Sequence, residues 1–290
     1  MASTNDQAFI SQFSDNIHML VREQGSKLRS ILPTEMAKGE KHMFERIDKL
    51  TVSEITDRNT VLDATDAAHS RRMATVRRYA GRVHLDDIDK LKMLIDPTSE
   101  YAKALADAHG ANYDQILYDA LLGTASTGKD GSGSQAFDTS NQQIAHGSAG
   151  LTVAKFNQAL RILENNEIDI DRVKLYATIG ALGVEDLLND TSNQFTSFDY
   201  QDGKALATGG LPSFRGVNIV RTQRVPDETA DTTYRALLFT DDCLKTAISN
   251  DLELRVDERI DLAHVQQVTA YMMFGAVRME EKKVVDILYQ

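Results

Sequence analysis

The sequence predicts an α+β protein with one long helix, an extended polar hairpin and a series of carboxy-terminal strands. Three observations support this class. Apolar residues recur at helical spacing after Asp96-Pro97, short polar and β-branched runs fill residues 40–85, and alternating or continuous apolar runs follow residue 217. A chain of 290 residues is long enough for about two domains or for one elongated fold.

Composition excludes several classes of protein. The net charge of −11 argues against a protein whose main task is to hold a polyphosphate backbone. No apolar run is long enough to span a membrane, and the polar start of the chain does not resemble a secretion signal, so we expect a cytoplasmic protein without a membrane partner. Because Cys243 is the single cysteine, we expect no intrachain disulfide and no multi-cysteine metal site, and we expect Cys243 to be a small buried hydrophobe.

Charge is distributed unevenly along the chain. Residues 1–95 carry a net charge of +1 and residues 96–290 a net charge of −12. Between Ala67 and Leu85 there are five arginines and no acid: Arg71, Arg72, Arg77, Arg78 and Arg82. A basic segment on an acidic body suggests contact with an acidic surface, which in a homo-oligomer belongs to the next copy. A solvated basic loop is the alternative that composition leaves open.

The first predicted element is an amphipathic helix in an amino-terminal arm. Its apolar residues are Phe9, Phe13, Ile17, Leu20 and Val21, and the pattern ends near Gly25 and Pro33. This helix must lay its apolar stripe on another surface. Residues 40–85 follow as an extended hairpin, with strands near His42–Ile47 and Arg71–His84. Two strands with so few large apolar residues are not stable alone in water, so we expect the hairpin to lie across a neighbour.

The long helix is predicted from Asp96, a suitable N-cap, and Pro97, at the first helical position, to Leu122. Its length would be roughly 38 Å at 1.5 Å per residue. Gly110 is a possible kink or break within it. The stretch from Gly123 to Gly150 is rich in Gly, Ser, Thr and Asn, which predicts a flexible surface loop.

The remainder of the chain predicts a compact α/β region and further strands. A helix capped by Thr152 has one apolar side, formed by Val153, Phe156, Leu160 and Leu163. The predicted strands are Val173–Ile179, Val217–Arg221, Tyr234–Phe239, an alternating run through Leu252, Leu254 and Val256, then Val268–Val277 and Val284–Tyr289. The alternating run is typical of a sheet with one wet face.

The order of these elements resembles the major capsid proteins of tailed bacteriophages, with their Hong Kong 97 type fold. Five short phrases carry the resemblance: Gln24–Arg29, His69–Arg72, Asp96–Tyr101, Asp119–Gly123 and Phe274–Arg278. The resemblance covers nearly the whole chain and rests on the order and spacing of these phrases. It implies an amino-terminal arm (residues 1–35), an extended loop (36–86), a peripheral domain (87–150 and 248–290) with a spine helix at about 97–122, and an axial domain (151–247).

The resemblance also implies function and partners. Copies would self-assemble as hexamers and pentamers into an icosahedral shell around double-stranded DNA, bound without sequence specificity, in a virion assembled in the host cytoplasm. Subunit contacts are expected at Arg71, Arg72, Arg77, Arg78, Arg82, Phe9, Phe13 and Ile17. Portal and decoration proteins are expected partners. Because the arm begins within ten residues of Met1, we expect a separate scaffolding protein and no maturation cleavage. No catalytic residue, cofactor or metal is expected.

Two alternatives remain. A shell of the encapsulin type shares the implied fold and would enclose cargo enzymes instead of DNA. An enzyme is suggested by Gly123–Lys129, which fits the G-x-x-x-x-G-K pattern of a P-loop. However, Asp130 stands where Ser or Thr should follow, and the motif follows a predicted helix instead of a strand. The acidic groups at 86–89 and 164–171 are expected to be solvated turns.

Overall fold

The computed structural model describes residues 23–50, 52, 54, 67–85, 98–189, 213–229, 232–262 and 264–290. Its strands and helices in chain order are β1 (Thr34–Met36), β2 (Lys41–Ile47), β3 (His69–Thr75), β4 (Arg77–Leu85), α2 (Thr98–Leu122), β5 (Ala125–Thr127), β6 (Gly133–Gln135), α3 (Thr139–Gln142), β7 (Gln143–Ile144), α4 (Val153–Asn165), β8 (Leu175–Ile179), α5 (Ala181–Asn189), β9 (Ser213–Phe214), β10 (Val217–Arg221), β11 (Tyr234–Thr240), β12 (Leu244–Arg259), β13 (Val265–Arg278) and β14 (Val284–Tyr289). Short 3-10 turns at Ile260–Leu262 and Glu281–Lys283 flank β13.

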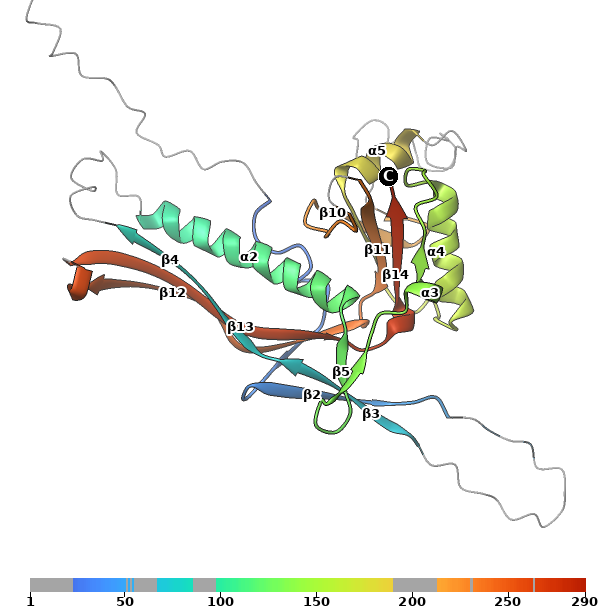
Figure 1. Cartoon of the computed structure of the whole chain (residues 1–290), viewed down its shortest axis with the longest axis horizontal. Coiled ribbons are helices and arrows are strands. Elements are labelled where there is room, and N and C mark those ends of the chain that lie inside the picture. Colours follow the sequence, from blue (N-terminus) through green and yellow to red (C-terminus); the bar gives the residue numbers. More distant parts are fainter. Residues whose placement is uncertain are drawn as a thin grey trace, which may run out of the picture.

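Three sheets organise these strands. A long four-stranded sheet has the order β1-β12-β13-β4, a six-stranded sheet the order β7-β14-β11-β8-β10-β9, and a small sheet the order β2-β3-β5-β6. Figure 1 shows α2 lying along the long sheet, α4 and α5 beside the six-stranded sheet, and the β2–β3 hairpin running beneath. One apolar cluster joins α2 to strands of both larger sheets, through residues such as Leu117, Phe239 and Phe274.

Helix α2 is continuous over 25 residues, so the predicted helix is confirmed and the possible break at Gly110 is wrong. Instead, the lack of a side chain at Gly110 lets the backbone of another segment pass close to the helix. A Cβ at Gly110 would lie 2.4 Å from the backbone carbon of Gly25, because the chain at the base of the arm crosses the helix here. The predicted cap at Asp96 and Pro97 lies outside the described residues.

Several predicted elements are confirmed in the second half of the chain. Thr152 caps α4 by accepting a hydrogen bond from the Lys155 backbone at 3.3 Å, and the predicted apolar side of α4 is buried. Strands β10 and β14 have the predicted bounds. Strand β14 pairs with β11 in the six-stranded sheet, although residues 248–290 were expected in the peripheral domain. The domain boundaries themselves stay a prediction.

The strand predicted from Arg71 to His84 is two strands. β3 pairs with β2, whereas β4 pairs with β13 along its whole length, and the chain passes between the two sheets at buried Val76. Residues 77–85 are therefore supported by their own chain, contrary to the expectation that the whole hairpin needs a neighbour. Alternation has the same period in both strands, so the sequence gives no signal for the switch.

The stretch Gly123–Gly150, predicted as a flexible surface loop, lies largely at the surface but is not irregular throughout. It contains the hairpin β5–β6, the short helix α3 and strand β7, and it buries Gln142 and Ile144. Backbone pairing of β5 with β3 and of β7 with β14 orders a stretch whose composition is typical of a loop.

Candidate functional site

The five arginines predicted at subunit contacts occupy different environments. Arg71 is partly exposed and donates two hydrogen bonds to Glu45, at 3.0 and 2.6 Å. Arg77 and Arg82 are exposed on β4, and Arg78 lies over the ring of Tyr271 at 4.8 Å. The structure brings Arg71 and Arg72 to one cavity and leaves the other three along β4. Phe9, Phe13 and Ile17 lie outside the described residues.

Arg72 is buried inside its own chain. It is 3% exposed and donates from Nη2 to both carboxylate oxygens of Glu281, at 2.8 and 3.0 Å. Arg72 therefore has an acidic partner within its own subunit, and its place at a subunit contact stays a prediction. Burial lowers the pKa of Arg72 and Glu281 opposes this shift, so the guanidinium stays charged.

Arg278 is a second buried arginine beside Glu281, and these three residues form what we call the buried junction. It is fully buried, and its Nη1 donates to the carbonyls of Leu121 and Gly123, at 2.6 and 2.7 Å, which closes the carboxyl end of α2. Its Nε lies 3.7 Å from Glu281. Glu281 therefore stands between two arginines and ties β3, the end of α2 and the turn before β14 together. Sequence reasoning missed this role, although a charged residue ending the apolar run of β13 was a signal.

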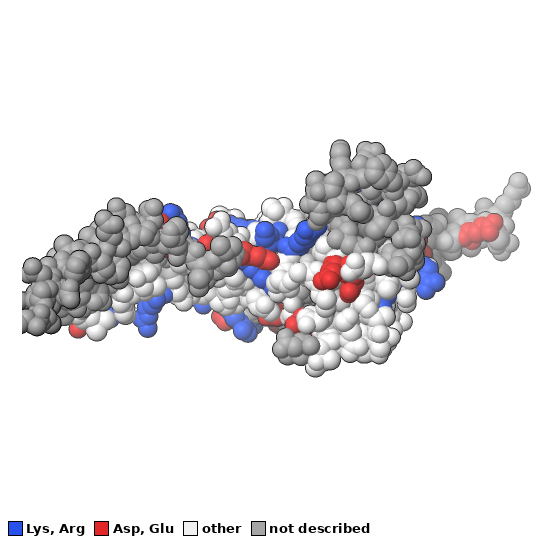
Figure 2. Space-filling model, turned by 90° about the horizontal axis from the view of Figure 1, so that it is seen from above, with Lys and Arg blue, Asp and Glu red and all other residues white. Residues whose placement is uncertain are grey.

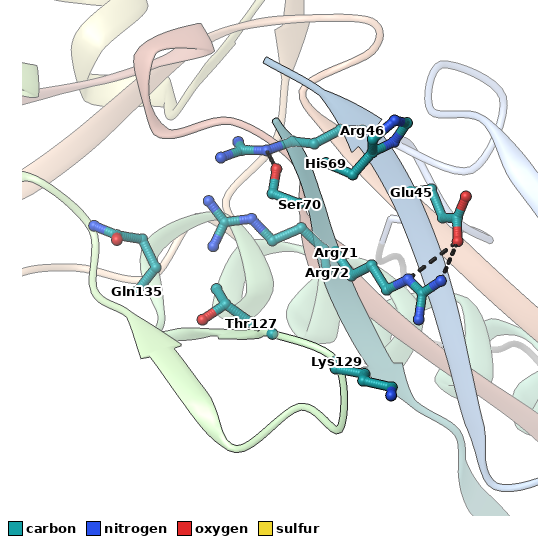
Figure 3. A pocket seen from close by; sticks show the side chains of 10 residues that line it. Glu45, Arg46, His69, Ser70, Arg71, Arg72, Thr127, Lys129 and Gln135 are labelled. Carbon is teal, nitrogen blue, oxygen red and sulfur yellow. Dashed lines mark hydrogen bonds and ion pairs between the residues drawn. The ribbon is translucent and has the colours of Figure 1, made fainter. Parts of the chain in front are cut away.

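A cavity of about 700 Å³ opens beside Arg72. Its lining comes from hairpin β2–β3 and hairpin β5–β6: Glu45, Arg46, His69, Ser70, Arg71, Arg72, Thr127, Gly128, Lys129 and Gln135 (Figure 3). Lys129 is the lysine of the P-loop-like motif. In the structure a helix precedes this motif and a β-hairpin forms it, which reverses the strand–loop–helix order that a P-loop needs. The elements around Gly123–Lys129 therefore do not support the nucleotide-binding alternative.

The base of the arm is held by Asp114 of α2, a residue that the sequence analysis did not single out. Its buried carboxylate accepts hydrogen bonds from the Ser26 hydroxyl at 2.5 Å, the backbone of Lys27 at 3.0 Å and the backbone of Leu28 at 3.2 Å. Arg224 donates to the same carboxylate at 2.6 Å. The signal was an acid at i−3, i−4 and i−7 from the buried residues Leu117, Tyr118 and Leu121.

Arg224 extends this clamp to the backbone of the arm. It donates to the carbonyl of Gly25 and to that of Glu23, each at 2.6 Å. Leu28, fully buried, inserts into the apolar cluster beside Tyr113. The phrase Gln24–Arg29, which carried part of the family resemblance, is therefore the point at which the arm is fastened to the spine helix.

The far end of β12 exposes apolar side chains. Val256 is 55% and Ile260 76% exposed, and Leu254 and Leu262 are also open to solvent. The alternating run at Leu252, Leu254 and Val256 was predicted to have one exposed and one buried face. In the subunit only Leu252 is covered, by packing on the cluster around Leu105, whereas the other two apolar side chains are exposed. Three pairs of polar side chains lie at this tip: Arg255 with Glu253, Arg259 with Asp261, and His264 with Glu258.

A second exposed apolar group lies around β1 and hairpin β2–β3: Met36, Ile47, Leu50 and Val52.

In the face shown in Figure 2, basic and acidic side chains are interspersed among uncharged surface. None of the helices in the described part of the chain is long and apolar enough to cross a membrane. Within the same ranges no three His, Cys, Asp or Glu side chains are grouped as metal ligands would be.

The comparisons with known proteins agree with this architecture. The model of a family described as phage capsid protein matches residues 6–290. Similar solved structures include one from Mycobacterium phage Che8 (16% identity, TM-score 0.75, 96% of this chain and 97% of that chain covered). The capsid asymmetric unit of cyanophage Pam1 has 15% identity and a TM-score of 0.78, with 100% and 99% covered. The acidic stable capsid of Helicobacter pylori bacteriophage KHP30 has 11% identity and a TM-score of 0.76, with 99% and 97% covered. No curated protein matches the sequence.

Proposed function

Because this chain belongs to the phage capsid protein family, we propose that it is the major capsid protein whose hexamers and pentamers form an icosahedral head enclosing double-stranded DNA. The fold is of the Hong Kong 97 type. Family membership implies a structural protein of the virion, and we assign it no catalytic residue and no cofactor.

The observation that carries the proposal is apolar surface that the subunit leaves uncovered. Large apolar side chains stand exposed at the tip of β12 and around hairpin β2–β3, at two separated parts of an elongated molecule. Uncovered apolar surface of this kind is typical of association sites. Sister subunits in a shell would cover both ends at once. Strand β4 is supported by β13, so the uncovered apolar side chains of this region are those at the end of β2 and just after it, namely Ile47, Leu50 and Val52.

The remaining partners belong to the same proposal. We expect assembly in the host cytoplasm with a separate scaffolding protein, a portal protein and possible decoration proteins. The division into arm (1–35), extended loop (36–86), peripheral domain (87–150 and 248–290) and axial domain (151–247) stays a prediction. An uncleaved subunit should have the same mass in precursor and mature particles, which mass spectrometry measures.

Expression of the chain with and without a scaffolding protein, followed by electron microscopy, tests the proposal. We expect regular closed particles, and in infected cells nuclease-protected genomic DNA within them. Particles that hold cargo enzymes instead of DNA would favour the encapsulin alternative. A well-folded, protease-resistant monomer at high concentration would contradict both kinds of shell.

A further inference from the structure

The cavity between hairpins β2–β3 and β5–β6 is lined by more cations than acids. Four of its lining residues are cationic, namely Arg46, Arg71, Arg72 and Lys129, whereas Glu45 is the single acid among them. We propose that this cavity binds carboxylates carried by an extended segment of a second copy of the chain. The inference rests on the proposed shell function and identifies one contact within it.

The acids near the cavity already pair with arginines of the same subunit. Glu45 accepts both hydrogen bonds of Arg71, Asp48 lies 3.8 Å from Arg46, and Glu281 is shared between Arg72 and Arg278. Lys129 is exposed, and none of the ion pairs found among the described residues includes it. Nη1 of Arg72 is buried without a hydrogen-bond partner. Lys129 is thus a cation of this cavity that an entering oxyanion can reach and that has no acidic partner among the described residues of its own subunit.

The backbone beside these cations is open as well. Strand β3 pairs with β5 at Arg72 and Met73, and β5 then turns away at Gly128, whose φ is 89°. In the described structure, no strand pairs with His69, Ser70 and Arg71 on that side. Figure 3 shows Arg72 reaching from β3 toward the side of Thr127 and Gln135, whereas Arg71 points the other way, toward Glu45. An open strand edge next to cations fits an extended acidic segment, which can add backbone hydrogen bonds to its ion pairs.

Carboxylates of a second copy fit better than phosphate. Residues 96–290 carry a net charge of −12, so every neighbouring copy offers many acids. Phosphate sites commonly use the amino terminus of a helix, whereas the cavity is built from two β-hairpins. The β2–β3 hairpin already engages such an acid within the chain, since Lys49 pairs with Glu167 of the exposed turn after α4.

Zero-length coupling tests the contact directly. A carbodiimide joins a lysine amine to a carboxylate in salt-bridge contact, so particles assembled from mixed light- and heavy-nitrogen subunits should yield mixed-isotope peptides that link Lys129 to Asp or Glu. Unassembled subunits should yield none. Coupling of Lys129 within one copy alone, or no coupling while other lysines react, would overturn the inference.

A charge reversal gives an independent measurement. Lys129→Glu should raise the subunit concentration needed for particles by about tenfold or more, because the cavity would repel the incoming acids. Lys174→Glu, at another exposed lysine, makes the same charge change and should assemble as wild type. Circular dichroism checks that both variants fold. Equal assembly of the two variants would refute the contact but leave the shell function intact, whereas failure of wild type to assemble would refute the shell function itself.

The same lysine separates the sources of the anion. Acetylation of Lys129 in unassembled subunits should be unchanged by inorganic phosphate or by duplex DNA. It should fall when particles form. Protection by DNA or phosphate equal to that in particles would assign the cavity to another ligand and overturn the inference.

Discussion

At the scale of single residues, one carboxylate determines where the arm leaves the body. Asp114 receives hydrogen bonds from the Ser26 hydroxyl, two backbone amides and Arg224, so its charge is buried but fully partnered. A buried ion pair is strongly destabilising when one partner is removed, because the other charge is left uncompensated. Here that other charge is Arg224.

Asp114→Ala should therefore lower the free energy of unfolding by about 3–5 kcal/mol. Denaturant unfolding of unassembled subunits measures the change, and limited proteolysis should show faster cleavage near residues 23–28. Asp119→Ala, an exposed acid on the same helix, is the control and should change stability by less than about 0.5 kcal/mol. Equal effects of the two substitutions would contradict the clamp.

Cys243 gives a second prediction at this scale. It is fully buried, as the sequence predicted, and burial raises the pKa of its thiol well above the usual range, with Asp242 adding to the shift. Since the thiolate is the reactive form, Cys243 should resist iodoacetamide in the folded subunit and react after denaturation. Rapid labelling of native protein, followed by mass spectrometry, would show this burial to be wrong.

At the scale of elements, the packing of α2 against the segment that crosses it depends on the lack of a side chain at Gly110. Gly110→Ala would ordinarily stabilise a helix by about 1 kcal/mol. Here the new Cβ would meet the backbone of Gly25 at 2.4 Å, so we expect a lower melting temperature instead. Gln115→Ala, on the exposed face of α2, serves as the comparison and should leave the melting temperature unchanged or higher.

The junction of Arg72, Glu281 and Arg278 connects three elements. Arg278→Met should free the last carbonyls of α2 and leave Glu281 with one arginine, at a loss of about 3–5 kcal/mol. Hydrogen exchange should then accelerate at the end of α2 and along β3. Arg172→Met, at an exposed arginine, is the matched control. Unchanged exchange in β3 would mean that the junction does not connect the hairpin to the helix.

How far the sequence predicts these elements depends on whether their signal is local. Helix α4, strand β10 and strand β14 carry their own periodicity, and their predictions are confirmed. The switch from β3 to β4 depends on which sheet pairs with each half of one alternating run. The β5–β6 hairpin likewise gains order from β3, and its Gly- and Ser-rich sequence does not encode that pairing. For the same reason the cavity was not predicted: Arg71 and Lys129 line one cavity because β3 pairs with β5, and their spacing in the sequence gives no sign of this.

At the scale of the whole molecule, exposed apolar groups should matter for assembly and not for folding. Ile47→Ser combined with Val52→Ser removes two side chains that are 63% and 99% exposed in the single subunit. The free energy of unfolding should change by less than about 0.5 kcal/mol. Particle yield should fall severalfold, as measured by sedimentation. Ile47→Leu with Val52→Ile keeps the apolar surface and should assemble normally.

The passage of the chain at Val76 has a mechanical consequence. Strand β3 continues directly into β4, which is bonded to β13 from Arg77 to Leu85. A pull on the hairpin along the strand direction therefore loads this whole ladder in shear, so that its hydrogen bonds resist together instead of opening one after another. Traction on β3 reaches the sheet beneath α2 through a continuous covalent path, without relying on side-chain contacts.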